Sequence, residues 1–93
     1  MGQEHFLILN WHDNTSNKDV VNVIERSYNE DILTEKGVSY IEEKKADDTT
    51  FIPELVEDFQ NTARADMGDY HLEIVCEEDL DDLRGDYKEI TGV

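Results

Sequence analysis

The sequence predicts an α+β fold, a small two-layer sandwich in which two helices pack on one face of a small sheet. The expected order is β-α-β-α-β, followed by a short C-terminal helix and a final edge strand. Apolar residues make up 38% of the 93 residues and occur in patterned runs. Some runs have helical spacing, whereas others are continuous or alternate as in strands. The length suits a single domain, residues 1–93. A ferredoxin-like arrangement is one candidate.

The N-terminal part of the chain predicts a buried strand followed by a helix. Residues 5–11, HFLILNW, form a short apolar run typical of a strand buried on both faces. A polar turn follows, and residues 16–19 resemble the capped start of a helix. The next apolar residues have helical spacing and predict a helix that ends by about residue 31. These residues are Val20, Val21, Val23, Ile24 and Tyr28.

The middle of the chain leaves two alternatives open. In one, Lys36 and Gly37 close a tight hairpin between two strands. In the other, the helix continues to Glu35 and Gly37 lies near its C-cap. Both alternatives make residues 38–44 a strand, and residues 47–50 then form a turn.

A second helix is predicted from Thr50 to a stop at Gly68, with Pro53 in its first turn. Its core-facing stripe consists of Ile52, Leu55, Val56, Phe59, Ala63 and Met67.

The C-terminal third predicts a strand, a short helix and an edge strand. Residues 70–78 alternate, so Leu72 and Ile74 would face one way and Val75 and Glu77 the other. Residues 78–85 suit a short helix, and residues 86–93 a last strand at the edge of the sheet.

The charge of the chain restricts its partners. Asp and Glu number 24, Lys and Arg 8, and the net charge is −16. Such a surface repels DNA, RNA and anionic membranes, so we expect no direct contact with nucleic acid or membrane. A basic protein or a divalent cation is the expected counterpart. A single cysteine excludes an internal disulfide, and the N-terminus shows no signal peptide, so we expect a soluble, cytoplasmic protein.

No constellation of catalytic or metal-binding residues is evident. His71 and Cys76 would point to opposite faces of their strand, and we expect Cys76 to be buried and inert. His5, His12 and Asp13 lack the spacing of metal ligands. We therefore predict that the protein is not an enzyme and has no cofactor and no metal site.

The acidic residues sit at regular intervals on predicted helices and strands. Same-face neighbours on a strand repeat every ~6.7 Å, and helix residues four apart are separated by ~6 Å along the axis. B-DNA presents one phosphate per ~3.4 Å on each strand. A folded scaffold with this spacing can imitate a phosphate track. The predicted partner-binding acids are Glu54, Glu57, Asp58, Glu73, Glu77, Glu78, Asp79, Asp81, Asp82 and Asp86.

In this respect the chain resembles the small acidic DNA-mimic inhibitors that bacteriophages make against host restriction, CRISPR or nucleoid proteins. The resemblance rests on EEDLDDLRGD at residues 77–86, ADD at 46–48 and PELVEDF at 53–59, all on a compact chain. It implies a cytosolic inhibitor, often dimeric, that occupies the basic groove of a DNA-binding protein or nuclease.

Two other hypotheses remain open. An immunity protein or antitoxin would neutralise one basic toxin through shape-specific contacts, with Trp11 or Tyr87 as anchors, and its binding would survive high salt. A structural or adaptor domain from a salty environment would carry acids for solvation alone and would need salt to fold.

Overall fold

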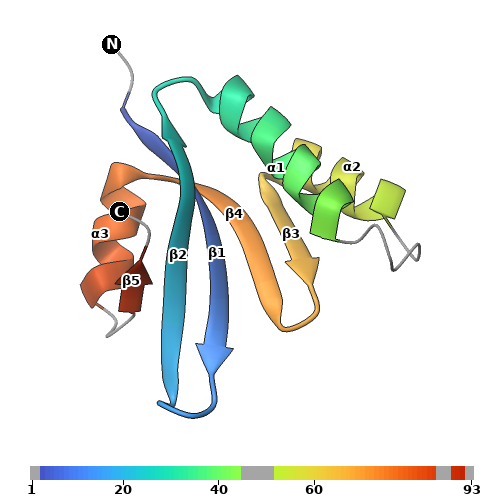
Figure 1. The fold of residues 1–93 in the computed structure, drawn as a ribbon. Coiled ribbons are helices and arrows are strands. Elements are labelled where there is room, and N and C mark those ends of the chain that lie inside the picture. Colours follow the sequence, from blue (N-terminus) through green and yellow to red (C-terminus); the bar gives the residue numbers. More distant parts are fainter. Residues whose placement is uncertain (1–2, 45–51, 86–88, 92–93) are drawn as a thin grey trace.

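The fold is built around a five-stranded sheet with helices on both faces (Figure 1). A computed structural model describes residues 3–44, 52–85 and 89–91. The elements in chain order are β1 (His5–Asp13), β2 (Lys18–Ser27), α1 (Glu30–Lys44), α2 (Ile52–Thr62), β3 (Arg64–Met67), β4 (Tyr70–Cys76), α3 (Glu77–Gly85) and β5 (Glu89–Thr91). The strand order is β3-β4-β1-β2-β5. The pairs β3–β4, β4–β1 and β1–β2 are antiparallel, and β5 pairs parallel with β2.

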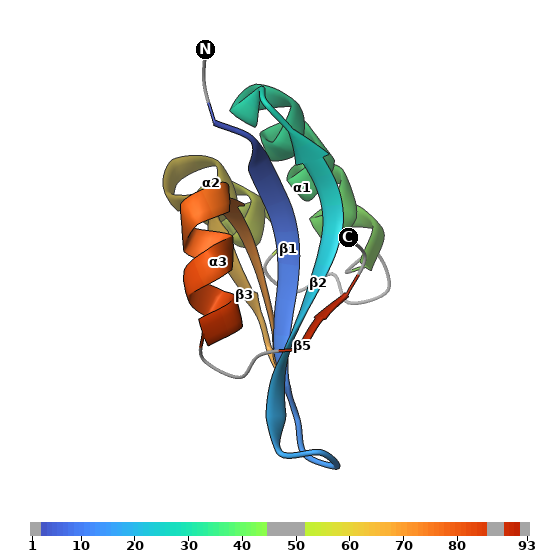
Figure 2. The same ribbon diagram turned by 90° about the vertical axis from the view of Figure 1, so that its left-hand side faces the viewer.

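The prediction of a two-layer α+β sandwich is confirmed. The sheet forms one layer and α1 with α2 forms the other, and we call the covered side of the sheet the helical-layer face (Figure 1). α3 lies against the opposite side, the α3 face, where Leu80 is 2% exposed (Figure 2). In the described parts of the chain, no helix is long and apolar enough to span a bilayer.

β1 occupies the middle of the sheet, between β2 and β4, and is buried on both faces as predicted. Leu7 and Leu9 pack on the helical-layer face against residues such as Phe59. Phe6 and Ile8 pack on the α3 face, beside Leu80. One strand therefore joins the two hydrophobic clusters of the protein.

The predicted helix over residues 16–31 is wrong, because most of this segment is strand β2. β2 pairs antiparallel with β1, and a register shift lies opposite Leu7 and Ile8. Val21 and Val23 pack on the α3 face, whereas Ile24 packs on the helical-layer face. A strand buried on both faces and shifted in register does not alternate in sequence, so its apolar positions resembled a helical spacing.

The residues that suggested a helix cap instead form the tip of the β1–β2 hairpin. The carboxylate of Asp13 accepts hydrogen bonds from the Thr15 amide and the Ser16 hydroxyl, both at 3.0 Å. Asn17 has a φ of 55°, a left-handed conformation that asparagine tolerates. Short polar side chains serve helix caps and turns alike, so the local sequence did not distinguish them.

Residues 31–35 are helical, as in the second alternative, but the helix does not end near Gly37, and the strand predicted over 38–44 is wrong: α1 runs through Gly37 to Lys44. Asn29 caps this helix, because its Oδ1 accepts a hydrogen bond from the Asp31 amide at 2.9 Å. Gly37 is buried against Phe59 of α2. The glycine permits a close approach of two helices rather than a turn, and that tertiary requirement has no local signature.

The second helix begins near the predicted start but ends earlier. α2 ends at Thr62, and Ala63 has a φ of 58° with its amide bonded to the Phe59 carbonyl at 2.8 Å. Residues up to Met67 form strand β3, and Gly68, with a φ of 79°, lies in the turn to β4. The order is therefore β-β-α-α-β-β-α-β rather than β-α-β-α-β, and it is not the ferredoxin-like one.

The C-terminal predictions are confirmed as far as the structure describes them. β4 alternates as expected, with Leu72 and Ile74 on the helical-layer face and Val75 on the α3 face. β4 ends at Cys76 and α3 begins at Glu77, so Glu77 and Glu78 belong to the helix rather than to the predicted strand. The helix covers the predicted residues 78–85, and β5 is an edge strand. The predicted turn at residues 47–50 lies outside the described residues.

The contact between Gly37 and Phe59 predicts the effect of a small substitution. A Cβ at position 37 would overlap Cε2 and Cζ of the Phe59 ring. Overpacking of this kind costs about 1–3 kcal/mol, so Gly37→Ala should lower the free energy of unfolding by that amount in urea denaturation.

Ser39→Ala, at an exposed position of the same helix, is the control and should change stability by less than about 0.5 kcal/mol. In the double variant with Phe59→Leu, the smaller side chain should reduce the additional cost of Gly37→Ala. An equal cost of Gly37→Ala in both backgrounds would show that the ring is not the cause.

Candidate acidic interaction surfaces

Three of the predicted acids, Glu54, Glu57 and Asp58, lie exposed on α2. This helix turns Phe59 to the core, where it is 1% exposed, and packs Leu55 and Val56 beside it. At 100° per residue, Glu54 and Glu57 then fall on the side opposite Phe59. Burial of the apolar stripe fixes these carboxylates on the outer surface.

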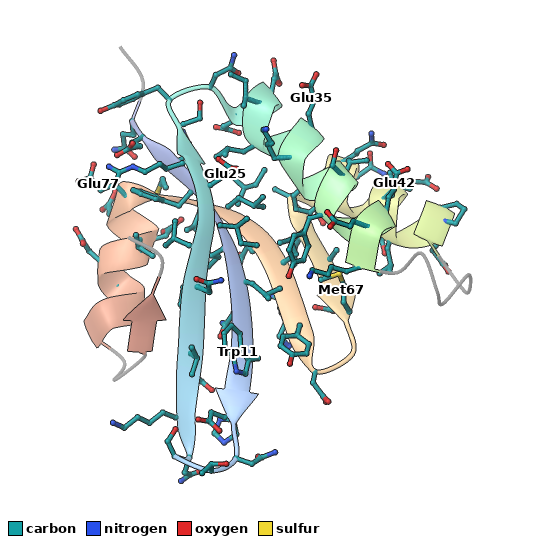
Figure 3. All side chains as sticks on the ribbon, in the orientation of Figure 1. Trp11, Glu25, Glu35, Glu42, Met67 and Glu77 are labelled. Carbon is teal, nitrogen blue, oxygen red and sulfur yellow. The ribbon has the colours of Figure 1, made fainter. Side chains whose placement is uncertain are left out.

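α1 adds acids that the sequence analysis did not select. Its buried stripe is Leu33, Gly37 and Ile41, spaced four residues apart. The exposed acids Asp31, Glu35, Glu42 and Glu43 lie on the same helix. The stripe and the Asn29 cap were the signals that could have identified α1. Figure 3 shows Glu35 and Glu42 projecting from the helix away from the sheet.

We define the α1–α2 acidic surface by the exposed acids of both helices that point to solvent. These are Glu30, which contacts His5, and Asp31, Glu35, Glu42, Glu43, Glu54, Glu57 and Asp58. Lys36 and Lys44 are the basic residues within the two helices, so the surface is strongly negative.

α3 carries the densest group of acids. Glu77, Glu78 and Asp79 occupy its first turn, Asp81 and Asp82 follow, and all five are exposed; these residues form the α3 acidic surface. Carboxylates in the first turn of a helix are stabilised by its macrodipole, typically by about 0.3–1 kcal/mol each. This effect offsets part of the repulsion within the run. Asp86 lies outside the described residues.

The predicted acids do not form one continuous track. Phe59 anchors α2 on the helical-layer face, whereas Leu80 anchors α3 on the opposite face, so their acids lie on different sides of the sheet. Glu73 is half-buried on β4, paired with Ile8 of β1, and shares the α3 face. The structure thus brings Glu73 and α3 to one side and separates them from Glu54, Glu57 and Asp58.

Both arginines whose side chains are described pair with acids outside the predicted set. Arg26 donates from Nε and one terminal amino group to Glu4, at 2.8 and 2.7 Å, and its hydrogen bond lowers the pKa of Glu4. Arg64 lies 3.4 Å from Asp66. Asp66 also accepts from His71 Nδ1 at 2.5 Å, which lowers the pKa of Asp66. Both arginines are therefore hydrogen-bonded to acids outside the two surfaces, although the charge of Arg26 also interacts with Glu77 at the start of α3.

A polar cleft of about 430 Å³ lies beside these pairs, lined partly by His12, Asp19, Arg64 and His71. It does not assemble a metal site: in the described residues, no three His, Cys, Asp or Glu side chains are grouped to hold an ion. His5 and His12 lie far apart along β1, and His5 instead contacts Glu30 at 3.0 Å.

Cys76 and His71 lie five residues apart on β4, so their side chains point to opposite faces of the sheet, as expected. Cys76, however, is half-buried rather than buried. Because the end of β4 is also the end of the sheet, its last side chain is less covered than those of Leu72 and Val75.

No known protein family matches this chain, and neither a curated protein nor a solved structure is detectably similar to it. Its function therefore has to be inferred from its own side chains.

The hairpin tip yields a pH-dependent prediction. His12 Nδ1 lies 2.9 Å from Asp19 Oδ1, and His12 Nε2 lies 3.2 Å from Asn17 Oδ1. The hydrogen bond to Asp19 is the main cause that raises the pKa of His12 above 6.5. The stabilisation from charged His12 should be fully present below pH ~6.5 and disappear as the pH rises through the raised pKa.

An NMR titration of the imidazole signals tests this prediction. Asp19→Asn should lower the pKa of His12, whereas Asp58→Asn, at an exposed position of α2 outside the cleft, should leave it nearly unchanged. A pKa of His12 that does not respond to Asp19→Asn would contradict it.

Proposed function

We propose that this protein is a DNA-mimic inhibitor that occupies the basic groove of a DNA-binding protein or nuclease through the α3 acidic surface. The observation that carries the proposal is the charge density of α3. Its nine residues hold five exposed carboxylates. At 1.5 Å per residue the helix is ~13.5 Å long, over which one strand of B-DNA presents about four phosphates, and the five carboxylates all lie on its first six residues.

The α1–α2 acidic surface supports the proposal less well. α2 has three exposed acids in 11 residues, or ~16.5 Å, where a DNA strand presents about five phosphates. α1 also interrupts its acids with exposed Lys36. This surface contributes long-range attraction, which raises the association rate, rather than the phosphate-like contacts.

The mechanism requires no chemistry beyond competition. A DNA-binding groove gains affinity by neutralising phosphates, and carboxylates on an ordered helix compete for its lysines and arginines. Because the helix is already folded and packed through Leu80, little ordering cost arises on binding. A cytoplasmic location, such as the cytoplasm of a phage-infected host, is part of this proposal.

The decisive experiment is capture from bacterial lysate by the tagged protein, followed by elution with duplex DNA or with a salt step. The proposal predicts capture of a basic DNA-binding protein that duplex DNA displaces and that elutes at raised salt. A captured partner that resists both treatments would refute it.

Two variants of equal net charge identify the surface. Glu77, Glu78, Asp79 and Asp82 are changed to Lys in one, and Glu42, Glu54, Glu57 and Asp58 in the other. Each variant loses four negative charges and gains four positive ones, so the net charge changes from −16 to −8 in both. The α3 variant should lose at least about 100-fold in affinity, and the α1–α2 variant less than about 10-fold.

Circular dichroism and thermal melting of both variants serve as controls, because lysines in the first turn of α3 oppose the helix dipole. Equal losses in two folded variants would show that total charge alone determines binding, and retained affinity in a folded α3 variant would exclude α3 as the contact.

An immunity-type inhibitor is the second candidate, and the exposed apolar side chains favour it. Trp11 is half-buried against Tyr70, which makes it a poor anchor, and Tyr87 lies outside the described residues. Tyr28 instead is 70% exposed and Ile32 44% exposed. For this candidate, Tyr28→Ala should abolish binding that withstands high salt, whereas a DNA mimic should tolerate the change.

A further inference from the structure

An open pocket of about 500 Å³ lies where the helical layer ends and the sheet continues, lined by Leu9, Tyr40, Lys44, Met67 and Tyr70. Tyr40 and Lys44 come from the last part of α1, and the other three residues from the sheet. Figure 3 shows Met67 below the C-terminal end of α1, with Trp11 further along the sheet. The volume lies within the range of small-molecule sites.

The lining of the pocket favours a flat apolar group. Leu9 and Met67, both 8% exposed, belong to the hydrophobic core beneath it. Tyr40 and Tyr70 add aromatic rings, and Tyr70 is 45% exposed. The ring of Trp11 contacts the ring of Tyr70, with centroids 5.6 Å apart and an interplanar angle of 51°. Aromatic rings of a ligand can stack in such surroundings.

The polar groups of the pocket favour an anion. Lys44 Nζ lies 5.6 Å from the centroid of the Tyr40 ring, and no described carboxylate forms an ion pair with it. Burial raises the pKa of Tyr40, and Tyr70 and the nearby carboxylate of Glu43 add to this effect, so the Tyr40 hydroxyl remains a hydrogen-bond donor at neutral pH. A cationic ligand would be repelled by Lys44, whereas a carboxylate would meet an ammonium group.

We propose that this pocket binds a small aromatic carboxylate, with its ring over Leu9 and Met67 between the two tyrosines and its carboxylate on Lys44 Nζ. The pocket is separate from α3, so this binding does not depend on the inhibitor function. The overall negative charge of the chain weakens the binding of an anion, and physiological salt screens that opposition.

Naphthalene-2-carboxylate is a suitable probe, and the chain supplies its own reporter. Trp11 is the single tryptophan, so its indole N–H gives one NMR signal that senses Tyr70. Titration in ~0.15 M salt should shift this signal saturably, with a Kd of about 10 µM to 1 mM. The neutral isostere naphthalene-2-carboxamide should bind at least about 10-fold more weakly.

Two lysines of α1 form a matched pair of variants. Lys44→Gln should weaken binding of the carboxylate by about 10-fold and leave the carboxamide unchanged. Lys36→Gln removes the same charge from an exposed position of the helix that does not line the pocket, and it should leave both unchanged.

Three results would overturn the proposal: no saturable shift up to ~5 mM probe, equal affinity for carboxylate and carboxamide, or equal loss in both lysine variants. Sedimentation velocity adds a fourth, because a dimer that Tyr70→Ala dissociates would show that a second copy of the chain covers the pocket.

Discussion

The burial of β1 on both faces is the constraint on which the rest of the structure depends. Leu7 and Leu9 require a helical layer on one side, and Phe6 and Ile8 require cover on the other, which Leu80 of α3 helps to supply. A chain of 93 residues with 24 acids has few apolar residues to spare. Each helix therefore packs its apolar residues toward the sheet, and its acidic residues remain on the solvent-exposed side of the helix.

This arrangement also explains how the charge is tolerated. The protein is flat, with principal extents of 41 × 35 × 19 Å, and its two acidic surfaces lie on opposite sides of the sheet. The Debye length at physiological ionic strength is about 8 Å, so repulsion across the sheet is largely screened. Repulsion remains within α3, where the helix dipole partly offsets it by stabilising the carboxylates of Glu77, Glu78 and Asp79.

The separation of the surfaces gives each side of the protein its own chemistry. A basic groove that engages α3 would leave the α1–α2 surface in solvent, where it adds to the attractive field without contact. The aromatic pocket at the end of α1 opens on the helical-layer face, with Lys44 as a cation in an acidic chain. Macromolecular and small-molecule binding could thus coexist on this small domain without sharing residues.

The sequence by itself determined the α+β class, β1, β4, α3 and the exposed acids of α2 and α3, because short runs with clear periodicity or strong caps report their environment locally. Only the tertiary structure decided that residues 18–27 are a strand, that α1 passes through Gly37, and that the acids divide between two faces. Val21 and Val23 pack in the cluster that contains Leu80 of α3, Ile24 packs against the cluster under α1 and α2, and Gly37 is required by the ring of Phe59. These demands arise from partners distant in sequence, so no local pattern of residues contains them.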